Sequence, residues 1–197
     1  MNVNPGVIIL NNVPPAPDAT IIVTGVGRSG TSMAAGVLHG LGLPLGSKWE
    51  EGLYEDQPLR TALFHFYHDM RAKLIGMYNH EFPRWGFKFP SLHRHMLPLE
   101  LGQFRNARLV VMYRDATATA IRARMQPWDI LAEQVALGLF VKTCVCPVLL
   151  GSYERAIAEP ENFAAVLAAF SGLKHRAGAA AVVGDKRAYL EAPHESS

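Results

Sequence analysis

The chain has 197 residues, of which 49% are apolar and 18% charged, and its formal net charge is +2. These values are typical of a globular protein with one buried core, so a single domain is expected. The small net charge gives no indication of a nucleic-acid partner. The first twenty residues have neither the basic start of a signal peptide nor a long apolar segment, so no membrane association and a cytoplasmic location are predicted.

Apolar periodicity predicts the elements in chain order. Residues 1–19, which include the proline-rich stretch 14–17, are interpreted as a loose leader, and residues 20–197 as one domain. Short apolar runs predict buried strands at 20–24, 85–89, 109–113 and 148–153. Two sets of apolar residues recur at helical spacing and predict helices. The first set is Met33, Val37 and Leu41, and the second is Leu59, Leu63, Phe66, Met70 and Leu74. Two later helices are predicted at 128–143, where Leu131, Val135 and Leu139 share a face, and at 161–170 after Pro160.

Strands therefore alternate with helices along the chain. This alternation favours an α/β fold, with three layers and a parallel sheet covered on both faces. In such folds the active crevice lies at the carboxyl ends of the strands. Cys144 and Cys146 are interpreted as buried thiols rather than as a disulfide framework. His65 and Asp69 share a helix face, but two ligands make a poor metal site, and no metal centre is predicted.

The segment 20–32, TIIVTGVGRSGTS, runs from an apolar strand through a glycine-rich turn into a helix. Backbone N–H groups in such a turn, with the positive end of the helix, bind phosphate or sulfate oxygens. The spacing of Gly25 and Gly30 matches the ATP/GTP phosphate loop, but Thr31 stands where that loop requires lysine. Arg28 supplies a cation within the turn instead. The predicted anion-binding residues are Gly27, Arg28, Ser29, Gly30, Thr31 and Ser32; the alternative is an ordinary strand-to-helix turn with a solvated arginine.

This turn resembles the 5′-phosphosulfate loop of sulfotransferases, in which Lys or Arg precedes Ser-Gly-Thr-Thr/Ser. Other segments resemble motifs of the bacterial and phage members of that family in the same order. They are GLYED at 52–56, WGFKFP at 85–90, LVVMYRDATATA at 109–120, and the 149–173 region with its Tyr-Glu, Glu-Pro and Phe-Ser-Gly-Leu elements. The resemblance covers roughly residues 20–173. It implies a phosphate-loop nucleotide-binding fold that transfers a sulfuryl group from 3′-phosphoadenosine-5′-phosphosulfate to a hydroxyl or amine, leaving adenosine 3′,5′-bisphosphate.

The resemblance also implies roles for residues outside the loop. Arg114 follows the third predicted strand and is expected to bind the 3′-phosphate, because a guanidinium binds two oxygens at once. The family pattern has a serine eight residues later, where this chain has Arg122. Arg122 then either binds the phosphate through charge or marks a site that no longer fits this nucleotide. Another interpretation is an ordinary solvated helix face.

Sulfuryl transfer needs an in-line acceptor and cations that neutralise charge on the leaving phosphate. Arg28 and Lys88 are the expected cations, and Glu55 is the expected general base, with His93 and His95 next in order. A surface position for Lys88 is the alternative. For Glu55 the alternative is a solvated side chain beside Asp56, which would cap a helix before Pro58. No metal is expected to be required, since a sulfuryl group is less anionic than a phosphoryl group.

The acceptor is expected to be a small molecule or carbohydrate, and the sequence predicts no oligomeric state. Two other functions stay open. A phosphate-loop kinase would need a magnesium ligand such as Asp115, and a non-catalytic relative would bind nucleotide without turnover.

Overall fold

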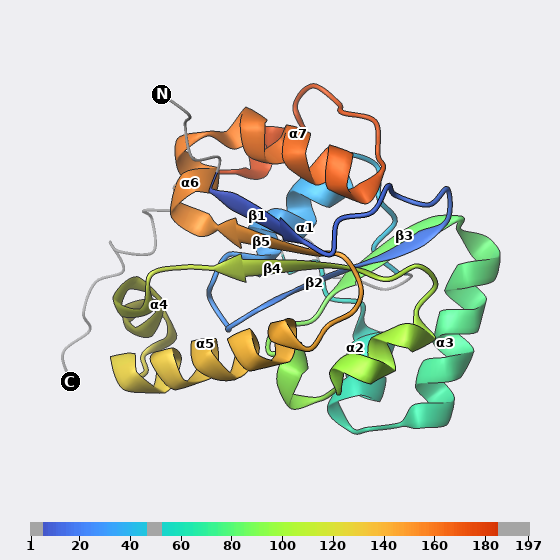
Figure 1. Cartoon of the computed structure of the whole chain (residues 1–197), viewed down its shortest axis with the longest axis horizontal. Coiled ribbons are helices and arrows are strands. Elements are labelled where there is room, and N and C mark those ends of the chain that lie inside the picture. Colours follow the sequence, from blue (N-terminus) through green and yellow to red (C-terminus); the bar gives the residue numbers. More distant parts are fainter. Residues whose placement is uncertain (1–5, 47–52, 185–197) are drawn as a thin grey trace, which may run out of the picture.

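A computed structural model describes residues 6–46 and 53–184 (Figure 1). Its strands are β1 (Val7–Leu10), β2 (Ala19–Gly25), β3 (Arg84–Lys88), β4 (Arg108–Tyr113) and β5 (Val148–Ser152). Its α-helices are α1 (Thr31–Gly40), α2 (Gln57–Phe64), α3 (His68–Glu81), α4 (Ala116–Ala123), α5 (Pro127–Lys142), α6 (Tyr153–Ala158) and α7 (Pro160–Ser171). Three 3-10 turns are η1 (Leu92–Arg94), η2 (Pro98–Gln103) and η3 (Ala179–Val182). None of the described helices is long and apolar enough to span a membrane.

The strands form one sheet in the order β1-β5-β4-β2-β3, in which β2, β3, β4 and β5 are parallel. The chain passes from β2 to β3 on one side and then to β4 on the other side of β2. This reversal creates a topological switch point at the carboxyl end of β2, where α/β sheets bind ligands. All four predicted strands are present, although Tyr153 begins α6 rather than ending β5.

The edge strand β1 pairs antiparallel with β5, from Val7 opposite Gly151 to Leu10 opposite Val148. The leader predicted over residues 1–19 is therefore not loose along its whole length. Its residues 1–5 and the last residues of the predicted domain, 185–197, lie outside the described parts of the chain. The predicted all-parallel sheet is likewise corrected to a mostly parallel one.

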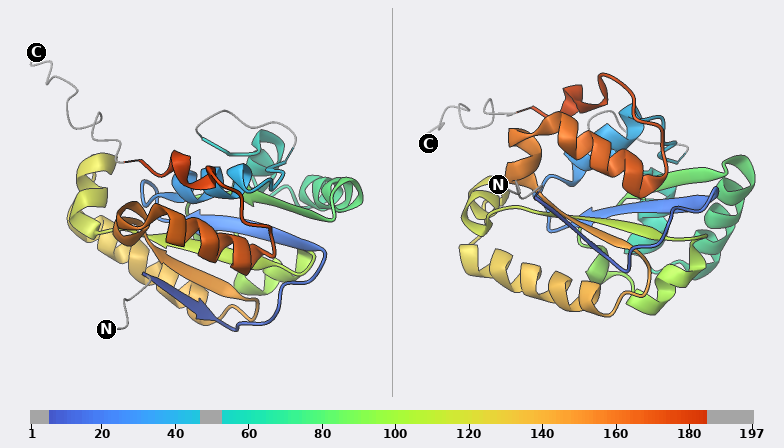
Figure 2. Two further views of the ribbon diagram at one scale, coloured as in Figure 1. Left: turned by 90° about the horizontal axis from the view of Figure 1, so that it is seen from above. Right: turned by 45° about the horizontal axis from the view of Figure 1, so that its top comes forward.

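Helices cover both faces of the sheet, as the strand pattern predicts. Every residue of β2 is buried, and Ile21 and Ile22 enter cores on opposite faces because side chains alternate along a strand. One core is shared with α1, α6, α7 and η3, and the other with α2, α3, α5, η1 and η2. Figure 2 shows α1 and α7 over the same face. The three-layer α/β/α arrangement is thus present.

Two helical predictions are wrong in detail. The stripe predicted from Leu59 to Leu74 does not lie on one helix, because Phe66 has a φ of +56° and separates α2 from α3. Phe66 is 51% exposed. The helix predicted at 128–143 is present as α5, but its Leu131, Val135 and Leu139 face solvent. The buried residues of α5 are Ile130, Leu137, Phe140 and Val141.

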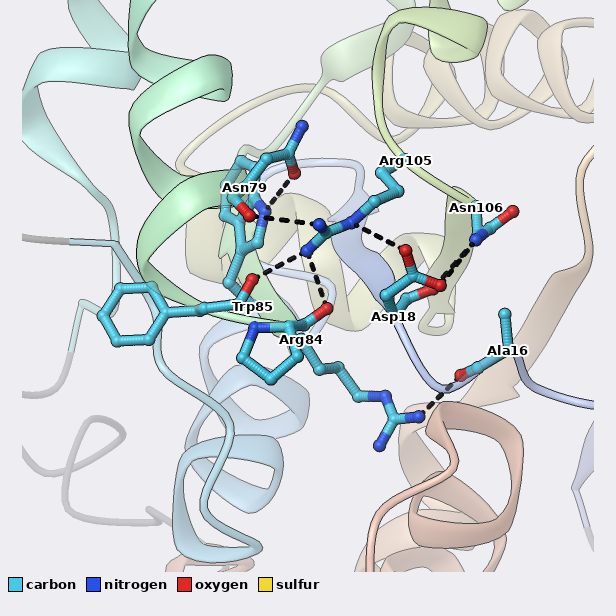
Figure 3. Close-up of polar contacts among 9 residues, drawn as sticks. Ala16, Asp18, Asn79, Arg84, Trp85, Arg105 and Asn106 are labelled. Atoms are coloured by element: carbon cyan, nitrogen blue, oxygen red, sulfur yellow. Dashed lines mark hydrogen bonds and ion pairs between the residues drawn. The ribbon is translucent and has the colours of Figure 1, made fainter.

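Loops at the amino ends of the strands are joined by a polar network (Figure 3). The guanidinium of Arg105 donates to the carbonyl oxygens of Asn79, Phe82 and Pro83 at 3.0, 2.7 and 2.7 Å. Its Nε also lies 3.4 Å from a carboxylate oxygen of Asp18. These contacts fix the starts of β2 and β3 relative to the loop before β4.

Candidate functional site

The loop from β2 to α1, residues 26–30, is tightly folded. A Cβ on Gly25 would lie 2.4 Å from Ser29 Oγ and 2.5 Å from the carbonyl oxygen of Met112, so only glycine fits between β2 and β4. Arg28 and Gly30 have φ angles of +71° and +99°. The first turn of α1 contains no acidic side chain, and its cap residue contributes no side-chain hydrogen bond. The N-terminus of α1 therefore offers its backbone donors and positive dipole to an anion.

A cavity of about 570 Å³ lies beside this helix N-terminus, at the carboxyl ends of the parallel strands. It brings together the predicted anion-binding residues other than Ser29, the two arginines predicted for the 3′-phosphate, and the expected base and cation of the chemical step. Those residues are Gly27, Arg28, Gly30, Thr31, Ser32, Glu55, Lys88, Arg114 and Arg122. The Ser29 side chain is buried instead, and its Oγ has no hydrogen-bond partner among the described residues.

Lys88 is buried and ends β3, so the surface position considered for it is excluded. Its Nζ lies 2.8 Å from Glu55 Oε1 and donates to Ser32 Oγ at 3.0 Å. Burial lowers the pKa of Lys88, the hydrogen bond to Glu55 opposes this change, and the positive charge of Arg28 reinforces it. Three segments far apart in sequence thus meet at one ammonium group.

Glu55 is an ion-paired residue rather than a solvated neighbour of the helix cap. Its second oxygen, Oε2, lies 3.0 Å from Nε of Arg60. Asp56 does cap α2, as one sequence interpretation expects, because its Oδ1 accepts from the N–H of Leu59 at 2.8 Å. Tyr78 donates to the other oxygen of Asp56 at 2.7 Å. The cap therefore holds Glu55 at the cavity wall. Gly52, the first residue of the GLYED segment, lies outside the described residues.

Arg114 follows β4 and stacks on an aromatic ring. Its guanidinium carbon lies 4.4 Å from the ring centroid of Tyr153, the first residue of α6. Its Nε and Nη1 atoms are buried and have no hydrogen-bond partner among the described residues. Buried donors are rarely left unsatisfied, so this guanidinium is suited to an anionic ligand.

Helix α4 carries Arg122 into the same cavity wall. Asp115, the magnesium ligand that a kinase would need, caps α4 and accepts from the N–H of Ala118 at 2.8 Å. It does not line the cavity. Among the described residues, no three His, Cys, Asp or Glu side chains gather closely enough to hold a metal ion.

Sequence reasoning did not assign site roles to Tyr54, Tyr153, Ala181 and Val182, all of which line the cavity. Tyr153 had a usable signal, since it directly follows β5 and the carboxyl ends of parallel strands share one edge. A Cβ on Gly30 would lie 2.4 Å from Cδ2 of Tyr153, so the glycine permits the ring to approach the loop. Ala181 and Val182 come from η3, a run of small residues whose sequence has no clear helix or strand pattern.

His93 and His95 do not line the cavity. His93 Nε2 lies 3.2 Å from Glu133 Oε2 on α5, and burial lowers the pKa of His93. The ring of His95 packs near those of Phe64 and Phe89, with centroids 5.3 and 5.2 Å away. The structure therefore brings Glu55, and neither histidine, to the predicted anion site.

Comparisons with protein-family models and with curated proteins found no match to this chain.

Proposed function

We propose that this protein is a sulfotransferase, built on a phosphate-loop fold, that uses 3′-phosphoadenosine-5′-phosphosulfate as donor. The observation that carries the proposal is the convergence of Arg28, Lys88, Arg114 and Arg122 with the N-terminus of α1 around one cavity. The acceptor in this proposal is a hydroxyl or amine of a small molecule or carbohydrate, the reaction requires no metal ion, and the location is the cytoplasm.

The cations form two groups that suit a ligand with two anionic ends. Arg28 and Lys88 line the cavity together with the N-terminus of α1, and the positive charge of Arg28 lowers the pKa of Lys88. Arg114 follows β4 and Arg122 belongs to α4, and both also line the cavity. We assign the 5′-phosphosulfate to the first group and the 3′-phosphate to the second. The unsatisfied Nε and Nη1 of Arg114 support this assignment, because a phosphate would supply the missing acceptors.

Lys88 and Glu55 are the residues proposed to act in the chemical step. The bound donor supplies an activated sulfuryl group, and the protein orients it and stabilises the charge left on the phosphate. Lys88 is placed to donate to that phosphate, since its ammonium already donates to Ser32 on the loop helix. Glu55 keeps further lone pairs beside those that Lys88 and Arg60 use, so its carboxylate can accept a proton from an acceptor hydroxyl.

Ligand binding tests the proposal directly. Titration calorimetry of the full chain should show adenosine 3′,5′-bisphosphate binding without divalent metal and more tightly than ATP. Arg114→Ala should weaken this binding roughly ten- to a hundredfold, as expected for the loss of a charged hydrogen bond. Adenosine 5′-phosphate, which lacks the 3′-phosphate, should lose little affinity. Arg124→Ala is the matched control, because Arg124 is exposed and does not line the cavity.

Tight ATP binding that requires magnesium, with no bisphosphate binding, would replace the sulfotransferase proposal with a kinase. If Arg114→Ala weakened the binding of adenosine 3′,5′-bisphosphate and of adenosine 5′-phosphate equally, Arg114 would not be the residue that binds the 3′-phosphate.

Turnover separates catalysis from binding. With an accepted substrate, Glu55→Gln should leave bisphosphate affinity nearly intact and lower kcat by about a hundredfold or more. Lys88→Met should lower kcat by a larger factor than it lowers bisphosphate affinity, because the charge on the leaving phosphate grows in the transition state. Lys142→Ala, at the far end of α5, serves as control. Full activity of Glu55→Gln across the pH range would eliminate it as the base. Bisphosphate binding without turnover for any acceptor tested would favour a non-catalytic relative.

A further inference from the structure

A second cavity, of about 470 Å³, lies at the amino ends of the strands, away from the proposed sulfotransferase site. Most of its lining is apolar, but Arg108 and Cys146 also line it. Cys146 belongs to the loop that joins α5 to β5, which Figure 1 shows at the opposite end of the sheet from α4. A thiol and a cation therefore share a cavity that the proposed function does not use.

The two cysteines of this loop are held in a defined arrangement. Nδ2 of Asn11 donates to the carbonyl oxygens of Cys144 and Cys146, at 2.9 and 3.2 Å, and so links both to the end of β1. Cys144 is buried, and its Sγ lies 3.4 Å from the carbonyl oxygen of Phe140. Cys146, two residues further along the chain, is only partly buried. Both cysteines are free thiols.

Arg108 places an uncompensated positive charge in this cavity. It is only 3% exposed, and its two terminal nitrogens donate to the carbonyl oxygen of Val13 at 3.1 Å. Its guanidinium lies over the ring of Phe170, and its Nε has no partner among the described residues. None of the described carboxylates pairs with it. A buried cation without a carboxylate favours a thiolate nearby.

The charge pattern distinguishes the two thiols. The interaction with Cys144 and the charge of Arg108 lower the pKa of Cys146, and burial opposes this change. The same interaction, together with burial, raises the pKa of Cys144. Cys146, which lines the cavity, is thus the more acidic of the two thiols, and the buried Cys144 is the less acidic one.

We propose that Cys146 is a nucleophilic thiol that undergoes exchange with small disulfides entering this cavity, and that Cys144 is its resolving partner. Cys146 Sγ attacks one sulfur of a disulfide RSSR, forms a mixed disulfide, and releases RS⁻. Cys144 Sγ then attacks the Cys146 sulfur and releases the second RS⁻. The two protons of the original thiols go to the released thiolates. The dithiol and RSSR thus yield a Cys144–Cys146 disulfide and two RSH.

Oxidised glutathione is the probe that tests the proposal on the native full chain. Mass spectrometry of the wild-type protein should show loss of two hydrogens and an internal disulfide, with two glutathione molecules released per chain. Cys144→Ser should stop at one glutathionyl group on Cys146, and its hydroxyl still provides a hydrogen-bond donor. Cys146→Ser should react at least about tenfold more slowly, because the remaining thiol is buried.

A second measurement requires no variant. Limiting N-ethylmaleimide on the native wild-type chain, followed by peptide mapping, should label Cys146 at least about tenfold over Cys144. Equal labelling, a stable mixed disulfide in the wild type, or no reaction with glutathione disulfide would each overturn the proposal. Binding of adenosine 3′,5′-bisphosphate is an independent readout, so the outcome here does not depend on that of the sulfotransferase proposal.

Discussion

Arg28 combines an unfavourable backbone conformation with a favourable position for charge. Its φ of +71° lies in the left-handed region, which costs a non-glycine residue about 1–2 kcal/mol. Its side chain is exposed at the cavity, so side-chain packing does not offset this unfavourable backbone energy. The proposed function would account for an arginine at this strained position, because its guanidinium would bind the 5′-phosphosulfate.

Arg28→Gly should therefore separate ligand binding from stability. Glycine adopts this φ freely, so the thermal midpoint should stay within a few degrees of the wild type or rise. Affinity for adenosine 3′,5′-bisphosphate should fall roughly ten- to a hundredfold. Arg28→Lys, which keeps the charge, should retain most of the affinity. A destabilised Arg28→Gly protein with unchanged affinity would give Arg28 a structural role.

Glu133 links stability to pH through its contacts with Arg94 and His93. Nε of Arg94 donates to Glu133 Oε2 at 2.7 Å, and this hydrogen bond is the main cause that lowers the pKa of Glu133 below its ordinary value of 4.5. A depressed carboxylate pKa in the folded state adds stability above the unfolded-state pKa. That stability is lost as the pH falls through the folded-state pKa.

The gap in unfolding free energy between wild type and Glu133→Gln should therefore be largest above about pH 5 and shrink toward roughly pH 3. Urea denaturation at several pH values measures it. Glu81→Gln is the control, since Glu81 is exposed and none of the described cations pairs with it. A gap that stays constant over this range would show that the carboxylate makes no charge-dependent contribution.

At the level of elements, α5 shows that apolar spacing identifies a helix without identifying its buried face. Leu131, Val135 and Leu139 are 51%, 62% and 61% exposed, whereas Leu137 is fully buried. The exposed residues and the buried ones, Ile130, Leu137, Phe140 and Val141, both recur at helical spacing, because most of the α5 sequence is apolar. Which set is buried depends on how the helix packs against the sheet.

Two leucines of α5 make a matched pair for a stability test. Leu137→Ala should lower the free energy of unfolding by about 2–5 kcal/mol, because it removes buried apolar atoms and leaves a cavity. Leu131→Ala should change it by less than about 0.5 kcal/mol. Denaturant unfolding of both variants measures the difference. Equal losses would mean that the exposed face of α5 is covered in solution.

At the scale of the whole molecule, the two ends of the sheet carry different groups of polar residues. The carboxyl ends of the strands carry the proposed anion site, and the amino ends carry the polar network of Figure 3. Arg84 adds to this network by donating to the carbonyl oxygens of Gly172 and Ala16, at 2.7 and 2.6 Å. The proposed anion site thus lies at one end of the sheet, and the contacts that tie distant loops together lie at the other.

Arg105→Ala should therefore lower stability without affecting the opposite end. Three carbonyl oxygens would lose a charged donor, so the expected loss is about 1–3 kcal/mol in the free energy of unfolding. Affinity for adenosine 3′,5′-bisphosphate should match the wild type at temperatures where the variant is folded. Arg124→Ala, an exposed arginine outside this network, is the control. Wild-type stability of Arg105→Ala would show that solvent replaces these contacts at no cost.

Local patterns in the sequence determined the parallel strands, the glycine-rich turn and the position of Lys88 at a strand end. These features depend on short-range physics, namely apolar runs that must be buried, a turn that needs glycine, and a helix that starts at a defined residue. Because parallel strands end at one edge, Arg114, which directly follows β4, lies at the same edge as the loop, and both line one cavity.

Only the tertiary structure decided which distant groups touch. The ion pair of Lys88 with Glu55, the stacking of Arg114 on Tyr153, and the pairing of β1 with β5 all join segments far apart in the chain. Such contacts depend on the packing of whole elements, which no local periodicity encodes. The same reason explains α5, because its own sequence is apolar on more than one side and the sheet beneath it decides which side is buried.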